Sequence, residues 1–476
     1  MALKALFSVT VFLLVLSFGG TELSAQQVEF QRVEKQRVII LTDITNEPDD
    51  QESLVRFLVY ANEYDVEGMI ATTSTWLRDR VRPDKIIEAV EAYGEVRNNL
   101  MKHAPGYPTH DHLLGVVKEH LPVYGMAGVG EGKSTSGSKH IIDVVDRDDP
   151  RPVWISIWGG ANCLAQALWD VRATRTDADV KTFVDKLRVY SISDQDDAGR
   201  WMRLEFPGLF YVVSPSGESY HEYYESTWSG IAGDRNYRNG PMHKFELVDN
   251  PWLEENVMRN HGPLGALYPP LTFIMEGDTP SFIGLINNGL GSAVSPAFGG
   301  WSGRYVLAQT YAETRPIWTN TTRGRDTVTA DNGIVDTSEQ ATIWRWREDY
   351  QHDFAARMDW CVAASYDDAN HNPVVVLNGN DTKDILYLTV NAGDRITLDA
   401  EDSHDPDGNE LSYKWWQYRE AGTFQGDVVI SGESEDRIEC VIPKESIDKT
   451  IHIVLTLRDN GEPSLYAYRR IIVKVR

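Results

Sequence analysis

Four carboxylates lie within eight positions of one another near the start of the chain. Asp43, Glu47, Asp49 and Asp50 all stand in the stretch DITNEPDD. Carboxylates packed this closely repel one another unless a cation or a hydroxylated ligand joins them. A carboxylate in such a group can also take a proton from a water or a sugar hydroxyl. The alternative is that Asp49 and Asp50 only favour the positive end of a helix dipole, which explains two acids but not four.

The segments around this acidic turn predict how it is positioned. Residues 38–41 form a short, β-branched apolar run that is typical of a buried parallel strand, and residues 66–71 form a second one. Between them, Leu54, Phe57 and Leu58 have the one-face spacing of a helix. The acids therefore follow the carboxyl end of the first strand, which is where open α/β sheets bind ligands.

Two later segments repeat the pattern of a buried strand followed by a polar turn. Residues 153–158 lead through two glycines to Asn162, which can cap the helix that starts there. Residues 187–192 lead to Asp194, which we expect to face the site, whereas the acids after it are explained by a helix N-terminus. Alternating strands and helices predict an α/β domain with a mostly parallel sheet and helices on both faces.

Three further segments contribute candidate residues. Residues 221–234 mix aromatic, glycine and polar residues, so they form either a lid in which His221 and Trp228 contact a sugar or a packed helix and loop. His261 precedes a proline-rich stretch and is predicted to line the same cleft. Asp278 follows a short apolar strand, in the motif EGDTPSF.

Five motifs of the chain point to a known family. TDI-x-NEPDD, WGG-x-N-x-LA, SDQDD, EGDTPSF and DFAARMDW all stand here. Together they resemble a bacterial family of nucleoside-hydrolase-like, cellulose-binding proteins, from Arg37 to the C-terminus. The acidic turn also resembles the signature of nucleoside hydrolases, Asp-Thr-Asp-Pro-Gly-Ile-Asp-Asp, in which the cluster holds one Ca²⁺.

The resemblance implies a Ca²⁺ cofactor at the carboxyl ends of the strands. Asp50 and Asp278 match ligand positions of nucleoside hydrolases, and Asp43 is the third expected ligand. Calcium is preferred to zinc because carboxylates and carbonyls are available and no His/Cys cluster is. The resemblance also places the loop of Asn162 beside the metal, through backbone chemistry alone.

The resemblance also assigns catalytic residues. At the third signature position, nucleoside hydrolases have an Asp that ligates calcium and deprotonates water, and this chain has Thr45, which lacks that basicity. Glu47 is the predicted replacement base, and Asp49 is predicted to bond sugar hydroxyls. The family's leaving-group histidine is replaced by Gly277. The predicted sugar-binding residues are Asn46, Asn162, Asp194, His221, Trp228 and His261.

The two ends of the chain are predicted to differ in structure from the α/β domain between them. Residues 1–25 read as a secretory signal, with Lys4 before a short apolar run and a cleavage site near Ala25. Residues 26–365 are assigned to the α/β domain. Residues 366–476 contain about seven short alternating segments with turns between them, which predict an all-β, immunoglobulin-like sandwich similar to polycystic-kidney-disease-type domains.

Composition restricts the classes of ligand that the protein can bind. The net charge of −25 argues against binding nucleic acid, and no later stretch is apolar enough to span a membrane. Three widely spaced cysteines give no disulfide framework. Taken with the signal segment, the acidic turn and the family resemblance, these features predict a secreted protein that hydrolyses glycosidic bonds of a poly- or oligosaccharide with Ca²⁺ and is not an efficient nucleosidase. The alternative is a cellulose- or glycan-binding protein with a decayed hydrolase pocket. The oligomeric state stays open.

Overall fold

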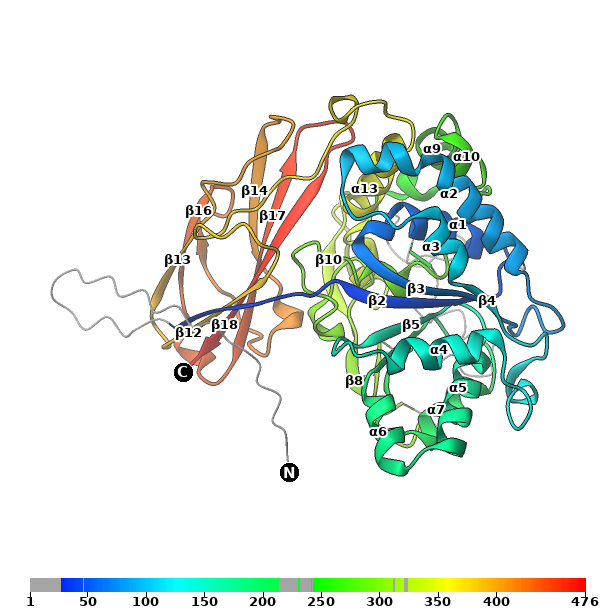
Figure 1. The fold of residues 1–476 in the computed structure, drawn as a ribbon. Coiled ribbons are helices and arrows are strands. Elements are labelled where there is room, and N and C mark those ends of the chain that lie inside the picture. The colour runs from blue at the N-terminus through cyan, green and yellow to red at the C-terminus, as the bar shows by residue number, and fades with distance from the viewer. Residues whose placement is uncertain are drawn as a thin grey trace.

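The structure is a computed structural model that describes residues 27–45, 47–213, 230–231, 241, 243–310, 313–320 and 324–476. The predicted signal peptide, residues 1–25, lies outside this part of the chain. An α/β domain is followed by an all-β sandwich, as the sequence predicts (Figure 1). In the described ranges, no helix has the length and apolar character needed to cross a membrane.

An eight-stranded sheet forms the centre of the α/β domain. Its strand order is β4-β3-β2-β5-β6-β7-β9-β8, and only the edge strand β8 is antiparallel to its neighbour. The strands are β2 (Gln36–Thr42), β3 (Tyr64–Ala71), β4 (Val117–Glu119), β5 (Val153–Ile157), β6 (Leu187–Ser191), β7 (Phe210–Val213), β8 (Val306–Ala308) and β9 (Ile317–Thr319). A separate hairpin consists of β10 (Asp326–Thr329) and β11 (Val335–Ser338).

Helices cover both faces of the sheet. Alternate residues of β2 accordingly pack into two different hydrophobic cores, one on each face. Val38 and Ile40 pack with α1, α2 and α13, whereas Ile39 and Leu41 pack with α4, α5 and α7. Apolar side chains on both faces explain why the strands read as continuous apolar runs. The helices are α1 (Asp49–Val59), α2 (Pro83–His103), α3 (His110–Gly115), α4 (Ser136–Asp146), α5 (Asn162–Thr174), α6 (Asp177–Asp185), α7 (Ala198–Glu205), α9 (Asn250–Leu253), α10 (Gly262–Ala266), α11 (Pro280–Ile283), α12 (Ala341–Trp344) and α13 (Arg347–Trp360).

Short 3₁₀ turns and one π turn connect these elements. The 3₁₀ turns are η1 (Ala61–Glu63), η2 (Gly125–Gly128), η4 (Phe245–Val248), η6 (Pro296–Phe298), η7 (Tyr366–Asp368), η8 (Arg419–Ala421) and η9 (Lys444–Ser446). The π turn, η5 (Glu254–Met258), continues directly from α9. The π turn packs against both α9 and α13, and these three elements form one wall of a cleft.

The sandwich consists of a five-stranded and a three-stranded sheet around its own apolar core. The strand orders are β1-β12-β18-β17-β14 and β13-β16-β15. The strands are β1 (Gln27–Gln31), β12 (Ile385–Val390), β13 (Arg395–Asp399), β14 (Leu411–Gln417), β15 (Ile430–Ser431), β16 (Arg437–Val441), β17 (Thr450–Asp459) and β18 (Tyr466–Val475). The sequence-based division at residue 365 leaves β1 in the first domain, whereas the structure pairs it with β12 in the second (Figure 1).

Buried aromatic and charged side chains join the two domains. The ring of Trp346 lies 5.9 Å from that of Trp416 and 5.6 Å from that of Tyr468. Tyr418 donates a hydrogen bond to the fully buried Asp326 at the start of β10. Aromatic pairs of this kind contribute energy beyond their buried area, so the two domains form one packed unit.

Candidate functional site

Four buried aspartates converge at the carboxyl end of the sheet. Asp43 follows β2, Asp49 and Asp50 begin α1, and Asp278 precedes α11. Carboxylate oxygens of Asp49, Asp50 and Asp278 lie within 4.8 Å of one another. All four residues are at least 95% buried. We call these four residues the acidic cluster.

The local backbone explains why the acids of the turn face inward. Thr45 has a φ of 94°, a left-handed conformation that is strained for a β-branched residue, and it turns the chain sharply after β2. Helix α1 then begins at Asp49 without a side-chain cap, so Asp49 and Asp50 lie at the positive end of its dipole. The hydroxyl of Thr42 donates a hydrogen bond to Asp50 Oδ1 and fixes that carboxylate.

Burial and mutual repulsion raise the pKa of every aspartate in the cluster. Burial raises the pKa of Asp43 to about 6, and burial together with the charges of Glu47 and Asp43 raises the pKa of Asp49 to about 8. The pKa values of Asp50 and Asp278 also lie well above the ordinary range, mainly because of burial. The cluster is therefore unstable as a set of four bare anions.

The donor set of the cluster fits a hard divalent cation. Among the described residues, Asp43 Oδ1, Asp49 Oδ1 and Asp278 Oδ2 are buried without a hydrogen-bond partner. Buried carboxylates are normally paired or bound to a metal, because an isolated buried anion is strongly disfavoured. Oxygen ligands alone suit Ca²⁺, so the residues present fit the cation that the resemblance implies. Asp49 thus joins Asp50 and Asp278 as a candidate ligand, whereas Asp43, the third ligand predicted from the sequence, is not part of the group within 4.8 Å.

Glycines allow neighbouring loops to approach the acidic cluster closely. A Cβ atom on Gly159 would lie 2.5 Å from Asp43 Oδ1. The loop between β5 and α5 therefore packs directly against the cluster. Glu47 is half-buried in the turn before α1, and its charge acts on both Asp43 and Asp49. Asn46, His221 and Trp228 lie outside the described residues.

Asn162 ties together the loops that surround the cluster. Its Nδ2 donates to Thr73 Oγ1 at 3.2 Å and to the carbonyl of Val123 at 2.9 Å. Its backbone amide donates to Asp196 Oδ2 at 3.1 Å, and its Oδ1 is buried without a partner in the described part of the chain. The expectation that its side chain caps the helix is wrong, because Asn162 is the first residue of α5 and Ala161 precedes it as the N-cap.

Two predicted site residues have other partners. Asp194 accepts two hydrogen bonds of 2.8 Å from Arg203 on α7, so its carboxylate is committed to this ion pair and not to a ligand. His261 lies against α13, where its Nε2 is 3.1 Å from Asp359 Oδ1. The acid that joins the site loops is Asp196, whose pKa burial raises to about 7. Sequence reasoning assigned that residue only to a helix N-terminus.

An exposed tryptophan stands next to a loop that contacts the cluster. The buried Ser74 hydrogen-bonds Asp43 and accepts a 3.0 Å bond from the backbone amide of Trp76. Trp76 is 52% exposed, and nearby Arg78 lies 4.4 Å above the ring of Tyr124. Exposed aromatic rings of this kind offer apolar faces to sugar rings.

Comparison with known proteins decides the family. A family described as "Cellulose-binding Sde182, nucleoside hydrolase-like domain" matches residues 37–305. The family described as "Cellulose-binding protein Sde0182, C-terminal domain" matches residues 395–475. The chain belongs to the Sde182 family. The resemblance inferred from the five motifs is thereby confirmed.

A solved structure agrees with this Sde182-family assignment. A nucleoside hydrolase-related hypothetical protein from Saccharophagus degradans, described as associated with carbohydrate metabolism, is 39% identical, with a TM-score of 0.79. The match covers 93% of this chain and 100% of that one. The effector protein XopQ, solved with adenosine diphosphate ribose, is 11% identical over 70% of this chain and 96% of its own, but its TM-score of 0.36 carries no argument. A comparison with curated proteins gave no match.

The Sde182-family motif EGDTPSF has a structural role that sequence reasoning missed. Its Glu276 is fully buried and accepts hydrogen bonds from Arg56 at 3.0 Å and Tyr268 at 2.8 Å. The backbone amide of Glu276 donates to Glu52 at 2.8 Å. This network anchors the loop that carries Asp278. A charged Arg56 in an otherwise apolar stretch of α1 was the sequence signal for it.

Proposed function

We propose that this chain is a secreted protein that binds cellulose or a related glycan at a Ca²⁺ centre formed by the acidic cluster. The observation that carries the proposal is the convergence of four buried aspartates with three unpartnered oxygens. Membership of a cellulose-binding family supports a glycan as the partner. The predicted signal peptide supports secretion, and the net charge of −25 disfavours nucleic acid.

The residues of the site have separate tasks in this proposal. Asp50, Asp278 and Asp43 hold the cation, which when bound supplies the positive charge that hydroxyl oxygens can approach. Asp49 contributes one carboxylate oxygen to the cation as well, and its other oxygen accepts hydrogen bonds from sugar hydroxyls. Trp76 offers a ring face at the edge of the adjoining loop. Anchored by Glu276, the Asp278 loop keeps these groups in place before a ligand arrives, which reduces the entropy lost on binding.

Hydrolysis of a glycosidic bond is the second candidate function. The observation that favours it is Glu47, a half-buried carboxylate in the same turn as Asp49. Glu47 would take the proton from an attacking water, which is a task that Thr45 cannot perform. Because Glu47 occupies a different position in the turn, it would serve a sugar placed differently from that of a nucleoside.

Calcium binding and cellulose binding can be tested together. The wild-type protein, Asp50→Asn and the exposed control Asp148→Asn are melted with Ca²⁺ and with chelator, then mixed with microcrystalline cellulose. We expect Ca²⁺ at 100 times its Kd to stabilise the wild type and the control by about 2.7 kcal/mol. Asp50→Asn should lose most of this gain and its calcium-dependent retention on cellulose. Unchanged calcium binding in Asp50→Asn would contradict the proposed centre.

The same mixtures separate binding from hydrolysis. Soluble sugars released from amorphous cellulose and other polysaccharides are measured for the wild type and Glu47→Gln. Release that depends on Glu47 establishes the second candidate function. Retention without release of sugar leaves the protein a binding protein.

A further inference from the structure

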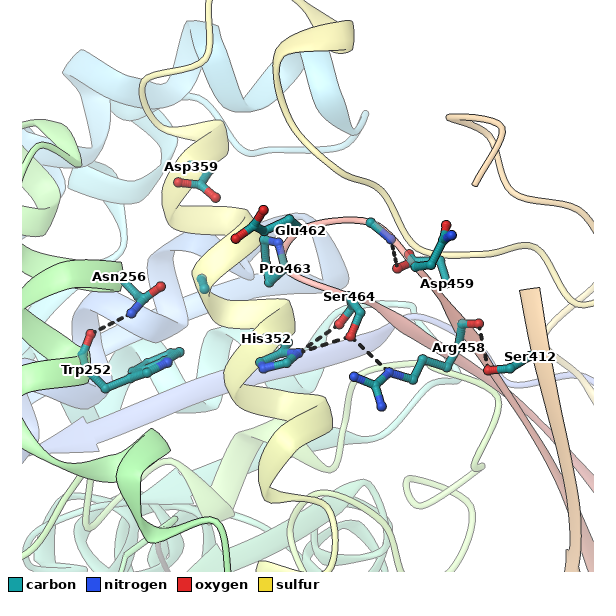
Figure 2. A pocket seen from close by; sticks show the side chains of 13 residues that line it. Trp252, Asn256, His352, Asp359, Ser412, Arg458, Asp459, Glu462, Pro463 and Ser464 are labelled. Atoms are coloured by element: carbon teal, nitrogen blue, oxygen red, sulfur yellow. Dashed lines mark hydrogen bonds between the residues drawn. The ribbon is translucent and has the colours of Figure 1, made fainter. Parts of the chain in front are cut away.

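A cleft of about 740 Å³ lies between the two domains, away from the acidic cluster (Figure 2). One wall comes from α9, η5 and α13, and the other comes from β14, the end of β17 and the loop between β17 and β18. The lining residues used below are Trp252, Asn256, His352, Asp359, Arg458 and Glu462. The volume falls in the range of ordinary ligand sites, so it suits a few sugar rings and not the face of a fibre.

We infer that this cleft is a second carbohydrate-binding site, which takes a short stretch of a neutral glucan independently of calcium. The inference rests on the proposed function, because it assumes that the protein's ligand is a glycan. It adds a location that shares no residue with the acidic cluster. A polysaccharide chain could then be held at two points of one molecule, and linked sites raise overall affinity.

Trp252 supplies an apolar ring face that is fixed in advance. It is half-buried and packs against the main core of the α/β domain. Asn256 Nδ2 donates to the carbonyl of Trp252 at 2.9 Å and holds the turn that carries the ring. In Figure 2 the indole points toward His352 on α13. A rigid aromatic ring offers contact area at a low entropic cost.

His352 supplies an acceptor for a hydroxyl group. Its Nδ1 lies 3.0 Å from the carbonyl of Ser464, and a carbonyl only accepts, so Nδ1 carries the proton. Burial keeps the pKa of His352 below its ordinary value, so the ring is neutral near pH 7. Nε2 is then a lone-pair acceptor, with no hydrogen-bond partner assigned among the described residues. A sugar hydroxyl is a suitable donor for it.

The charges that line the cleft favour a neutral ligand over an anionic one. The side chains of Asp359 and Arg458 are each 44% exposed, and Glu462 is exposed on the opposite loop. With Asp459, three acids and one base line the cleft, so it disfavours a polyanion and offers acceptors to the hydroxyl groups of a neutral ligand. Asp359 is held by His261 through one oxygen, which leaves the other for a ligand hydroxyl.

Hydrogen bonds between the domains fix the positions of the two walls relative to each other. Arg458 Nε donates to Ser464 Oγ at 3.0 Å, and its Nη2 donates to Glu348 on α13 at 3.3 Å. Ser464 in turn contacts His352 through its carbonyl. The cleft is therefore formed before a ligand binds. Helix α13 also connects to the loop of Asp278, because Gln351 accepts a hydrogen bond from Arg56, which in turn holds Glu276.

Titration of the full chain with cellohexaose in excess chelator tests the inference. The chelator removes calcium and so abolishes calcium-dependent binding. The affinity for cellohexaose that remains is therefore the affinity of the cleft. We expect the wild type to bind and Trp252→Ala to weaken the affinity by about three- to tenfold, the value of one aromatic contact. Trp252→Phe, which keeps a ring, should retain most of the affinity. Trp169→Ala is the matched control, because Trp169 is also half-buried but lies on α5.

The outcomes separate this inference from the proposed function. No binding of cellohexaose in chelator, or equal affinities of Trp252→Ala and Trp169→Ala, would overturn the second site. Melting temperatures show whether Trp252→Ala is folded, and His352→Gln provides a second variant that changes the cleft with little loss of volume. Calcium-dependent retention on cellulose, measured separately with Asp50→Asn, decides the proposed function whichever way the cleft experiment turns out.

Discussion

Gly277 lies directly against the carboxylate of Asp49, so that a Cβ atom at position 277 would be 2.2 Å from Asp49 Oδ2. The position that holds a histidine in nucleoside hydrolases therefore has no room here for any side chain. Asp49 fills the space instead, and its other oxygen, Oδ1, stays without a partner in the described part of the chain. The close approach of Asp49 to this backbone therefore depends on the absence of a side chain at position 277.

Replacement of Gly277 by alanine should displace Asp49 and weaken the calcium site. We expect Gly277→Ala to lower calcium affinity by roughly 10–100-fold, as for other changes that misplace a metal ligand. Isothermal titration with CaCl₂ measures this loss. Gly208→Ala is the control, because no atom lies within 4 Å of a Cβ built there. Equal affinities in the two variants would contradict the close packing of Gly277 and Asp49.

The stability of the calcium-free protein should fall as the pH rises. The folded pKa values of about 6 for Asp43 and about 8 for Asp49 exceed the unfolded value of about 4. Between pH 4 and 8 the folded state therefore binds more protons than the unfolded state, and the free energy of unfolding decreases with pH. Melting in chelator from pH 5 to 8 should show this decrease, and Asp49→Asn should flatten it. A wild-type melting temperature that rises more steeply with pH than that of Asp49→Asn would reverse the expected sign.

Calcium should offset this loss of stability at pH values at which the carboxylates are ionised. Metal binding requires deprotonated ligands, so its stabilising effect is expected to be larger at pH 8 than at pH 5. Melts at the two pH values with and without CaCl₂ measure the difference. Similar gains at both values would show that the titrating carboxylates are not the calcium ligands.

The protein should be a poor nucleosidase because Thr45 replaces the family's base. Loss of a general base lowers turnover by roughly 10²–10⁴-fold, so we expect very slow cleavage of inosine by the wild type. Thr45→Asp should raise that rate without loss of stability, because Asp tolerates the left-handed backbone at this position better than a β-branched residue does. Assays of inosine, uridine and aryl glycosides measure the rates. Rapid inosine cleavage by the wild type would contradict the prediction.

Removal of Arg56 should destabilise the whole α/β domain. Arg56 and Glu276 form a fully buried ion pair, so Arg56→Gln leaves an uncompensated buried carboxylate, which costs about 3–5 kcal/mol. Urea unfolding measures the change. Arg172→Gln, which breaks an exposed pair with Glu205, is the control and should cost less than about 1 kcal/mol. A small effect of Arg56→Gln would mean that the Glu276 loop has other anchors.

The strands at the site were predictable because they are covered on both faces. The apolar run at residues 38–41 lies inside β2, and the run at residues 66–71 lies inside β3. Asp43, Asp49 and Asp50 could be grouped from sequence because a single turn carries them. Asp278 required the family resemblance, since it is brought to the cluster from more than 200 positions away by the fold.

Residues whose partners are distant were harder to assign from sequence. Asp194 stands at a strand end like Asp43, but Arg203 on the next helix neutralises it, and sequence spacing alone gave no reason to pair the two. His261 was assigned to the sugar cleft, whereas its partner is Asp359 on α13. In both cases the decisive contact depends on the packing of helices, which local patterns do not specify.

The pairing of β1 with β12 has a consequence for how the chain is made. Shortly after β1, the backbone N–H of Val33 donates a hydrogen bond to Asp384 Oδ1. Asp384 directly precedes β12 and lies 351 positions further along the chain. Synthesis at about 5–20 residues per second leaves β1 without its partner for roughly 20–70 seconds. During that interval β1 is an open edge that other chains could extend. The sandwich is completed only when the residues from β12 onward emerge, so β1 reaches its final position long after it is made.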